Sequence, residues 1–213
     1  MGSDSLSILF RLSRFAFEVA IRLLFRMRIV GRDNLPEPPF IVASNHTSLL
    51  DPPLVGVVCK KYLVDFVVKQ ELFEFPVIGE WTKRVRCVPV RRGDNSIKGL
   101  RETLRRIKAG HVVGIFPEGT RSIDGSLQEA KTGTGFLMAM ARVPVVPVYV
   151  FGSSTAFPKG RGIKLGAEVG AIVGKPMYPD EFLIKTVSGK PDYAAIGNML
   201  MERISQLKES YED

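Results

Sequence analysis

Residues 39–51 read Pro39-Phe-Ile-Val-Ala-Ser-Asn-His-Thr-Ser-Leu-Leu-Asp51, a short apolar run that leads directly into polar side chains. Runs of similar length and β-branched character, typical of buried strands, recur at 64–68, 87–90, 112–116 and 145–150. Between and after them lie helical patterns at 52–61, 95–109, 133–142 and 192–210, and a Gly-rich segment at 160–176 that we expect to form strands. This alternation predicts an α/β fold, a single domain with a largely parallel central sheet flanked by helices.

The composition limits the class of protein further. The 213 residues include 30 Lys and Arg against 22 Asp and Glu, a net charge of +8 that favours an anionic partner. A hydrophobic content of 45% excludes a disordered protein, and a chain of this length needs no disulfide or zinc to fold. Cys59, Cys87 and the two histidines lack metal-ligand spacing, so we expect no metal site. Unpaired cysteines favour a reducing, cytoplasmic setting.

The N-terminal stretch 6–28 is predicted to be an amphipathic helix. Its polar positions follow helical steps, at Ser7, Arg11, Arg14, Glu18, Arg22 and Arg26. The charges between Arg11 and Arg22 argue against a membrane-spanning helix, and no secretory cleavage site follows. A wide Leu/Phe face beside an Arg stripe is typical of a helix that lies in an anionic membrane interface. We therefore expect residues 1–30 to be a membrane-anchoring helix and 31–213 to be the α/β domain. The alternative is a helix packed on the core.

The first candidate site follows the first strand, at the end of the strand where open α/β sheets bind ligands. On one continuous helix His46 and Asp51 would lie about 140° apart, so they can pair only across a turn, which Pro52 and Pro53 permit. In such a pair the aspartate fixes the ring tautomer and leaves the other nitrogen free to take a proton. The alternative is that Asp51 only caps a helix that begins at Pro52.

The second candidate site, Ile115-Phe-Pro-Glu-Gly-Thr-Arg-Ser122, also follows a strand. Pro117 and Gly119 predict a tight turn. The turn is expected to expose three polar side chains at the sheet edge, Glu118, Thr120 and Arg121. An arginine at that place can bind phosphate oxygens through two parallel hydrogen bonds. The alternative is an ordinary turn, and the histidine motif upstream argues against it.

With both motifs present, the chain resembles the glycerolipid acyltransferases, most closely the bacterial 1-acyl-sn-glycerol-3-phosphate acyltransferases. The resemblance covers residues 35–150 in four blocks that occur in the family's order. The first block is Asn45-His46 with Asp51, and the second is Lys69-Gln-Glu-Leu72 with Pro76 and Gly79, continuing to Arg86-Cys-Val-Pro-Val-Arg-Arg92. The third is Phe116-Pro-Glu-Gly-Thr-Arg-Ser122 and the fourth is Val143-Pro-Val-Val-Pro147. Ordered blocks form a far more specific signal than any one block alone.

The resemblance implies a reaction. A fatty acyl group passes from acyl-ACP, the acyl carrier protein thioester, or from acyl-CoA to the sn-2 hydroxyl of lysophosphatidic acid, giving phosphatidic acid. His46 would be the general base and Asp51 would orient it, which agrees with the need of an alcohol for a base. The enzyme would work at an anionic membrane surface, peripheral or monotopic on the cytoplasmic face, with no metal or further cofactor.

The resemblance also implies a substrate-binding set. By the family pattern Lys69 and Arg121 hold the acceptor phosphate, and Glu118 orients the acceptor or its arginine. Gly119 and Thr120 belong to the same binding turn, and backbone amides around Glu118 and Gly119 are candidate donors to the oxyanion of the tetrahedral intermediate.

Other functions stay open at this point. The acceptor could be another lysolipid or glycerol 3-phosphate, and the chain could be a non-catalytic membrane-binding member of the same fold, although the intact motifs argue against this. A nucleic-acid-binding protein, which the positive charge would suit, lacks any reader motif, so no nucleic acid partner is expected. His111 and Cys87 are expected to be structural.

Overall fold

The computed structural model describes residues 3–74, 76–84, 87–90, 96–158, 160 and 162–212. Within these residues the strands are β1 (Arg26–Val30), β2 (Ile41–Ser44), β3 (Val64–Lys69), β4 (Val88–Val90), β5 (Val112–Ile115), β6 (Val145–Phe151) and β7 (Glu168–Val173). The longer helices are α1 (Ser3–Leu24), α2 (Asp51–Val58), α3 (Pro76–Arg84), α4 (Ser96–Lys108), α5 (Thr132–Ala141) and α8 (Tyr193–Glu212). The shorter ones are α6 (Ser153–Ala156), α7 (Pro179–Phe182), and the 3-10 helices η1 (Arg32–Asn34) and η2 (Gln70–Glu74).

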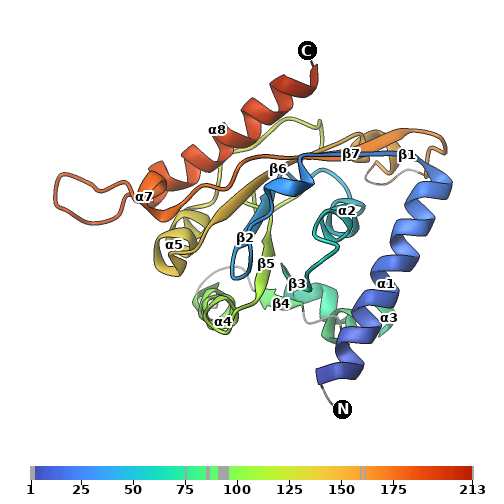
Figure 1. Cartoon of the computed structure of the whole chain (residues 1–213), viewed down its shortest axis with the longest axis horizontal. Coiled ribbons are helices and arrows are strands. Elements are labelled where there is room, and N and C mark those ends of the chain that lie inside the picture. Colours follow the sequence, from blue (N-terminus) through green and yellow to red (C-terminus); the bar gives the residue numbers. More distant parts are fainter. Residues whose placement is uncertain are drawn as a thin grey trace.

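All the strands belong to one sheet, in the order β1-β7-β6-β2-β5-β3-β4, with β2 at the centre (Figure 1). Neighbouring strands are parallel except β6 and β7, which are antiparallel. Because β2, β3, β5 and β6 run in one direction, their C-terminal ends meet at one edge of the sheet. The loops after β2 and β5 carry the two candidate motifs, so the topology brings both motifs to that edge.

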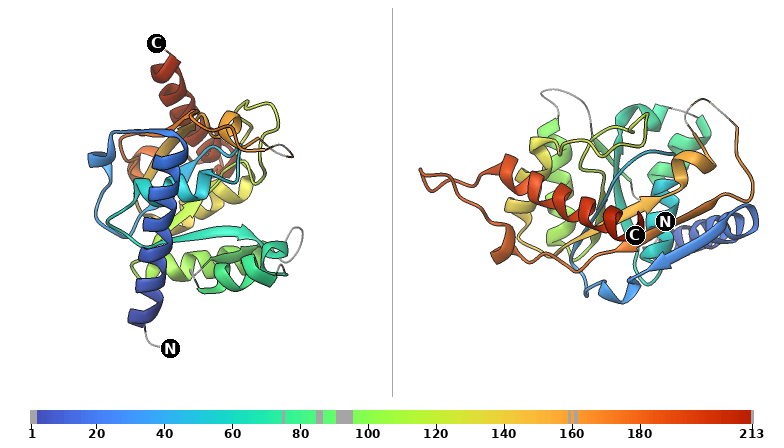
Figure 2. Two further views of the ribbon diagram at one scale, coloured as in Figure 1. Left: turned by 90° about the vertical axis from the view of Figure 1, so that its right-hand side faces the viewer. Right: turned by 90° about the horizontal axis from the view of Figure 1, so that it is seen from above.

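Helices cover both faces of the sheet, with α1 and α2 on one face and α4, α5 and α8 on the other (Figures 1 and 2). The four residues of β2 are all buried, as expected for a central strand covered on both sides. Successive side chains alternate between the layers: Val42 packs in the cluster that contains α1 and α2, whereas Ile41 and Ala43 pack in the cluster that contains α5 and α8. An apolar strand of this kind is stable only where both of its faces are covered. The turn after it is therefore attached to a well-packed strand.

The predicted α/β fold is confirmed, and the predicted helices and strands are present with ends shifted by at most four residues. The Gly-rich segment 160–176 differs, since only Glu168–Val173 forms a strand there. The remaining described residues of that segment form loops.

The N-terminal helix begins and ends earlier in the chain than predicted. It ends at Leu24, and Arg26–Val30 pairs in parallel with β7, with Arg26 opposite Glu168. No Gly or Pro stop signal separates the two elements, so the helical periodicity runs into the alternating pattern of the strand. The boundary predicted at residue 30 therefore cuts off an edge strand of the domain. Among the described helices, none combines the length and the apolarity needed to cross a membrane.

Candidate active site

The turn after β2 brings His46 and Asp51 together. The imidazole Nδ1 lies 2.8 Å from Asp51 Oδ2, with the carboxylate fully buried and the imidazole 17% exposed. A carboxylate only accepts hydrogen bonds, so Nδ1 carries the proton and Nε2 keeps its lone pair. The predicted pairing across a turn is confirmed, and it leaves one basic nitrogen for chemistry.

Asp51 also holds the turn itself. The same Oδ2 accepts the backbone N–H groups of Thr47 at 2.7 Å and Ser48 at 2.8 Å. α2 begins at Asp51, with Leu50 as its N-cap residue and a proline next in the chain. The alternative that Asp51 caps a helix starting at Pro52 is therefore wrong, because the carboxylate binds the turn before the helix.

The loop after β5, which carries the second motif, packs against the turn that contains His46. Glu118 is fully buried, and its Oε1 accepts the backbone N–H of His46 at 3.0 Å. The Ser122 N–H donates to the His46 carbonyl at 2.8 Å, so the second motif binds the peptide groups on both sides of the histidine. Burial raises the pKa of the Glu118 carboxyl to about 7, against the opposing effect of the backbone N–H groups of His46 and Gln128. The expectation that Glu118 is exposed is wrong, and its role as a ligand of the acceptor stays a prediction.

An aromatic ring fixes the plane of the imidazole. Phe116 stacks on His46 with the ring centroids 4.1 Å apart and 22° between the planes. Phe66 stacks behind Phe116 at 6.4 Å and 13°. Together with the bond to Asp51 these rings restrict the imidazole to one orientation. Sequence reasoning missed Phe116 as a positioning residue, although it is the last residue before the turn of the second motif.

The other residues of the second motif surround this centre. Gly119 has a φ of +66°, which favours glycine. Its N–H donates to the Phe116 carbonyl at 3.0 Å, so this amide is not free for an oxyanion and the expectation for it is wrong. Thr120 and Arg121 are half-buried. Within the described residues the Arg121 guanidinium has no hydrogen bond or ion pair, so it is available to an anion.

Lys69 is the last residue of β3, at the edge of the sheet that carries both motifs. Its side chain lies outside the part of the chain that the structure describes, as do Arg86, Arg91 and Arg92 of the second family block. The predicted contact of Lys69 with phosphate therefore stays a prediction.

Two polar residues beside His46 bind the turn after β2 to distant parts of the chain. The Asn45 amide donates to the Val150 carbonyl at 2.9 Å and accepts the Val150 N–H at 2.7 Å, with both groups buried. The Thr47 hydroxyl lies 2.9 Å from the hydroxyl of Ser153, the first residue of α6. Sequence reasoning did not identify these contacts, since the partners are more than a hundred residues away in the chain.

The remaining histidine and the cysteines lie apart from this site. His111 Nδ1 is 2.9 Å from Asp65 Oδ2, at the start of β3 and β5 and therefore at the opposite edge of the sheet. Arg106 donates to the same oxygen at 2.9 Å. Cys59 and Cys87 are buried, and burial raises the pKa of both thiols to about 12. Their contacts place these groups outside the candidate site, and the structural role of His111 and Cys87 stays a prediction.

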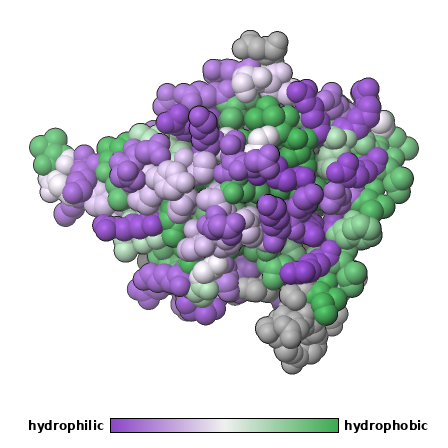
Figure 3. Space-filling model, viewed as in Figure 1, coloured by the Kyte–Doolittle hydropathy of each residue, from purple (hydrophilic) through white to green (hydrophobic). Residues whose placement is uncertain are grey.

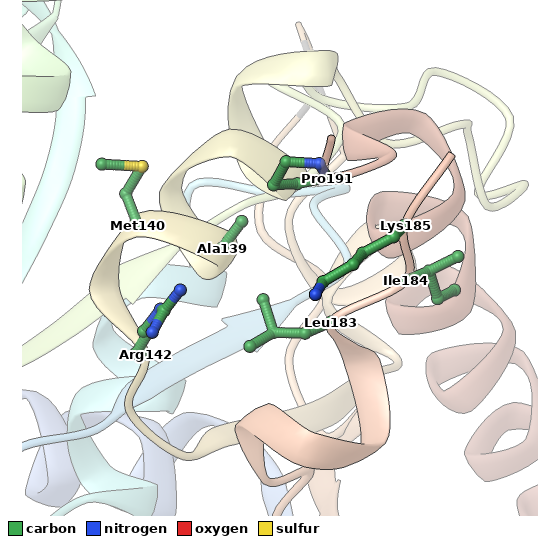
Figure 4. A pocket seen from close by; sticks show the side chains of 7 residues that line it. All are labelled: Ala139, Met140, Arg142, Leu183, Ile184, Lys185 and Pro191. Carbon is green, nitrogen blue, oxygen red and sulfur yellow. The ribbon is translucent and has the colours of Figure 1, made fainter. Parts of the chain in front are cut away.

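A pocket of about 250 Å³ lies away from both motifs (Figure 4). Its lining comes from the end of α5 and from the segment between α7 and α8, namely Ala139, Met140, Arg142, Leu183, Ile184, Lys185 and Pro191. α5 ends at the edge of the sheet where β6 begins, opposite to the edge that carries His46. We therefore assign the candidate active site to the two motifs and not to this pocket.

Relatives of the chain are found by sequence and by fold. Residues 26–151 match the family model described as Acyltransferase. A 1-acyl-sn-glycerol-3-phosphate acyltransferase of Bacillus subtilis (strain 168) is 29% identical over 197 residues, which cover 91% of this chain and 94% of that protein. A chloroplastic 1-acyl-sn-glycerol-3-phosphate acyltransferase of Brassica napus is 34% identical over 165 residues, which cover 75% of this chain and 47% of the plant protein.

The fold is similar to the crystal structure of the 1-acyl-sn-glycerophosphate acyltransferase PlsC from Thermotoga maritima. The TM-score is 0.74 and the sequence identity 26%, over 95% of this chain and 79% of that chain. The residues that match the family model, 26–151, run from the first residue of β1 to the last residue of β6 and contain both motifs.

Proposed function

The chain belongs to the acyltransferase family, and we propose that it transfers a fatty acyl group from an acyl thioester to the sn-2 hydroxyl of 1-acyl-sn-glycerol 3-phosphate. The product would be phosphatidic acid, an intermediate of phospholipid biosynthesis. The relatives from Bacillus subtilis and Thermotoga maritima, named for this acyltransferase activity, support the proposal. The observation that carries it is the His46–Asp51 pair. Asp51 binds Nδ1 of the imidazole and Phe116 stacks on the ring, so Nε2 is the nitrogen that can accept a proton from the substrate.

The proposed reaction uses this pair directly. His46 Nε2 takes the proton of the sn-2 hydroxyl while the hydroxyl oxygen bonds to the thioester carbon. Asp51 stabilises the resulting imidazolium through Nδ1–H. The tetrahedral intermediate then expels the thiolate, and the imidazolium returns its proton to the sulfur. No acyl-enzyme, metal ion or further cofactor enters these steps.

The acceptor phosphate needs cations near the histidine. We propose Arg121 for this role, because its guanidinium is half-buried beside the site and has no partner within the described residues. Lys69, at the end of β3, is the second proposed cation. Thr120 and the turn at Gly119 would contact the same phosphate. Glu118 would act on the substrate only through His46, whose backbone it binds.

We also propose that α1 contacts an anionic bilayer surface. One face of the segment packs in the core, where Phe10, Ile21 and Phe25 are buried, so the alternative of core packing accounts for that face only. The other face exposes an apolar stripe at helical spacing, between 38% and 79% exposed, made of Ile8, Leu12, Phe15, Val19 and Leu23. Hydrophobic residues follow the right-hand edge of the molecule in Figure 3, where α1 lies in Figure 1. Arg11 and Arg22 are exposed beside this α1 stripe.

In this arrangement the enzyme sits on the cytoplasmic face of the cell membrane, the setting that its two free cysteines favour. The lysophosphatidic acid arrives from the bilayer, and the acyl donor, either acyl carrier protein or coenzyme A, arrives from the cytosol.

The test is phosphatidic acid formation from lysophosphatidic acid in detergent, with acyl-ACP and acyl-CoA offered separately. We expect product from the wild type and a loss of at least about a hundredfold in kcat for His46→Ala. Asp51→Asn should lose less, because the imidazole remains. His111→Ala is the matched control, since His111 makes a similar contact with an aspartate at the opposite edge of the sheet.

The outcomes separate the alternatives. Full activity in His46→Ala would contradict the mechanism. No product with either donor would contradict the proposed acceptor, and a panel of other lysolipids and glycerol 3-phosphate would then find the true one. No product with any acceptor would leave a non-catalytic member of the fold.

A further inference from the structure

The segment between α6 and β7, of which the structure describes residues 157–158, 160 and 162–167, leaves the same edge of the sheet as residues 45–51, the proposed catalytic turn. β6 and β2 are parallel neighbours, so the chain emerges at that edge after each strand. The Ser48 hydroxyl donates to the Phe157 carbonyl at 2.8 Å. This bond ties the start of the segment to the turn between His46 and Asp51, so the segment borders the candidate active site.

The other end of the segment is bonded to the C-terminal end of α1. The Gly166 N–H donates to the Leu24 carbonyl at 2.8 Å, and the Arg26 N–H donates to the Ala167 carbonyl at 3.0 Å. This junction lies at the margin of the molecule, where the chain that leads into β7 passes the upper end of α1 (Figure 1). Residues 157–167 thus connect the α1 stripe with the catalytic turn.

Near this junction the segment exposes two large apolar side chains. Ile163 is 49% exposed and Leu165 is 67% exposed, with the exposed Lys164 between them. Leu23, at the end of the α1 stripe, is 79% exposed. Exposed apolar side chains that gather in one place mark an interaction surface, whereas isolated ones do not.

We propose that Ile163 and Leu165 form a second membrane-contact segment, which extends the α1 stripe toward the catalytic turn and brings that turn to the surface of a bilayer containing anionic lipid. The inference rests on the proposed function, which places the acyl chain of the acceptor in the bilayer. Cations lie next to the exposed apolar side chains at both places: Lys164 lies between Ile163 and Leu165, and Arg22 precedes Leu23. This pattern is typical of a membrane surface, where apolar side chains enter the acyl layer and cations contact the headgroups. A symmetric contact with a second copy would instead bring these cations against one another.

The second contact gives the acceptor a short path to His46. Withdrawing an acyl chain into water costs free energy for each methylene that becomes exposed. A catalytic turn at the bilayer surface lets the chain stay among the lipids while the glycerol hydroxyl reaches Nε2. If the membrane contact involved α1 alone, the acyl chain of the acceptor would have to pass through water between the α1 stripe and the catalytic turn.

The test compares vesicle binding of the wild-type full-length protein with that of three variants. The double variant Ile163→Asp with Leu165→Asp should bind phosphatidylcholine–phosphatidylglycerol vesicles at least about tenfold more weakly than the wild type in a flotation assay. Val187→Asp is the matched control, because Val187 is a fully exposed apolar residue in the segment between α7 and α8, at the left of Figure 1. Its binding should stay within about twofold of the wild type. Lys164→Glu should weaken binding to these vesicles but not to pure phosphatidylcholine.

Activity provides a second readout. With a short-chain, water-soluble lysophosphatidic acid the double variant should match the wild type, which also shows that it is folded. With long-chain lysophosphatidic acid in vesicles it should lose activity in step with binding. Should the wild type float with vesicles but form no product from any donor, the proposed function fails while the flotation assay still decides the membrane contact.

Two results would overturn the inference. One is vesicle binding by the double variant equal to that of the wild type. The other is a change in the mass of the lipid-free protein, measured by sedimentation, when Leu165 is replaced by serine, because this would make the surface an interface between copies of the chain.

Discussion

Replacing the buried Glu118 by glutamine should change how the stability of the protein depends on pH. The wild-type carboxyl is fully buried and burial raises its pKa from 4.5 to about 7. Glutamine keeps a carbonyl oxygen that can accept the His46 N–H, but it has no proton to lose. The substitution therefore removes the titration and preserves the contact that joins the two motifs.

The sign follows from the direction of the shift. Below pH 4.5 the carboxyl is protonated in both the folded and the unfolded wild type. As the pH rises from there toward 7, the unfolded chain ionises while the folded protein keeps the proton, so the wild type loses stability relative to Glu118→Gln. Above about pH 7 the loss is complete. Its size is on the order of 3 kcal/mol, at roughly 1.4 kcal/mol for each pH unit between the two pKa values.

Thermal unfolding of both proteins in detergent, from pH 4.5 to 8, measures this effect. For a chain of this length the Tm of the wild type should fall relative to that of Glu118→Gln by roughly 6–12 °C across the range. Groups that titrate in both proteins cancel in the difference. A Tm difference that stays constant from pH 4.5 to 8 would refute the reasoning, because it would mean that Glu118 titrates normally in the folded protein.

Three further predictions concern single sites. Asp51→Ala should destabilise the protein by roughly 2–5 kcal/mol, measured by thermal unfolding, because it leaves the backbone N–H groups of Thr47 and Ser48 without their acceptor. Gly135→Ala should destabilise the protein by at least about 1–3 kcal/mol, because the added Cβ would lie 1.8 Å from a carbonyl oxygen of α8. Gly133→Ala is the control: its Cβ would have its nearest atom at 3.9 Å, so the variant should be as stable as the wild type or more stable in the same assay. Cys59 and Cys87 should resist alkylation by iodoacetamide in the native protein at pH 8 and react after unfolding, as read by mass spectrometry; rapid labelling of either in the native state would contradict their burial.

The parts of the fold that the sequence predicts are those with a local cause. The strand before the histidine motif is apolar up to Ser44, which is typical of a central strand, and the helices between strands have regular periodicity. β1 has no such local cause: its pairing partner, β7, lies about 140 residues further along the chain, and its alternating pattern directly follows a helical one. The strand is defined by that pairing, which a local pattern cannot reveal.

The candidate site shows the same division. The spacing of His46 and Asp51 excludes a pair on one continuous helix, and the prolines after them permit a pair across a turn. The alternative that Asp51 only caps a helix is removed by the contacts of its carboxylate with the turn, which spacing does not reveal. A glutamate in a Pro-Glu-Gly turn is expected at the surface, and its burial under His46 depends on where the loop after β5 meets the loop after β2. The same holds for Asn45 and Phe116, whose roles are contacts across neighbouring strands. Residue type and spacing thus predict the proposed reacting groups, whereas the contacts that position them emerge only from the assembled sheet.

The junction between α1 and β1 is a single residue, Phe25, and its side chain is buried. With so short and buried a connection, α1 and the sheet move as one rigid body. When α1 lies on a bilayer as proposed, every tilt of the helix is a tilt of the whole domain. The enzyme would then keep one orientation relative to the bilayer, and it would encounter the acceptor lipid by lateral diffusion in two dimensions.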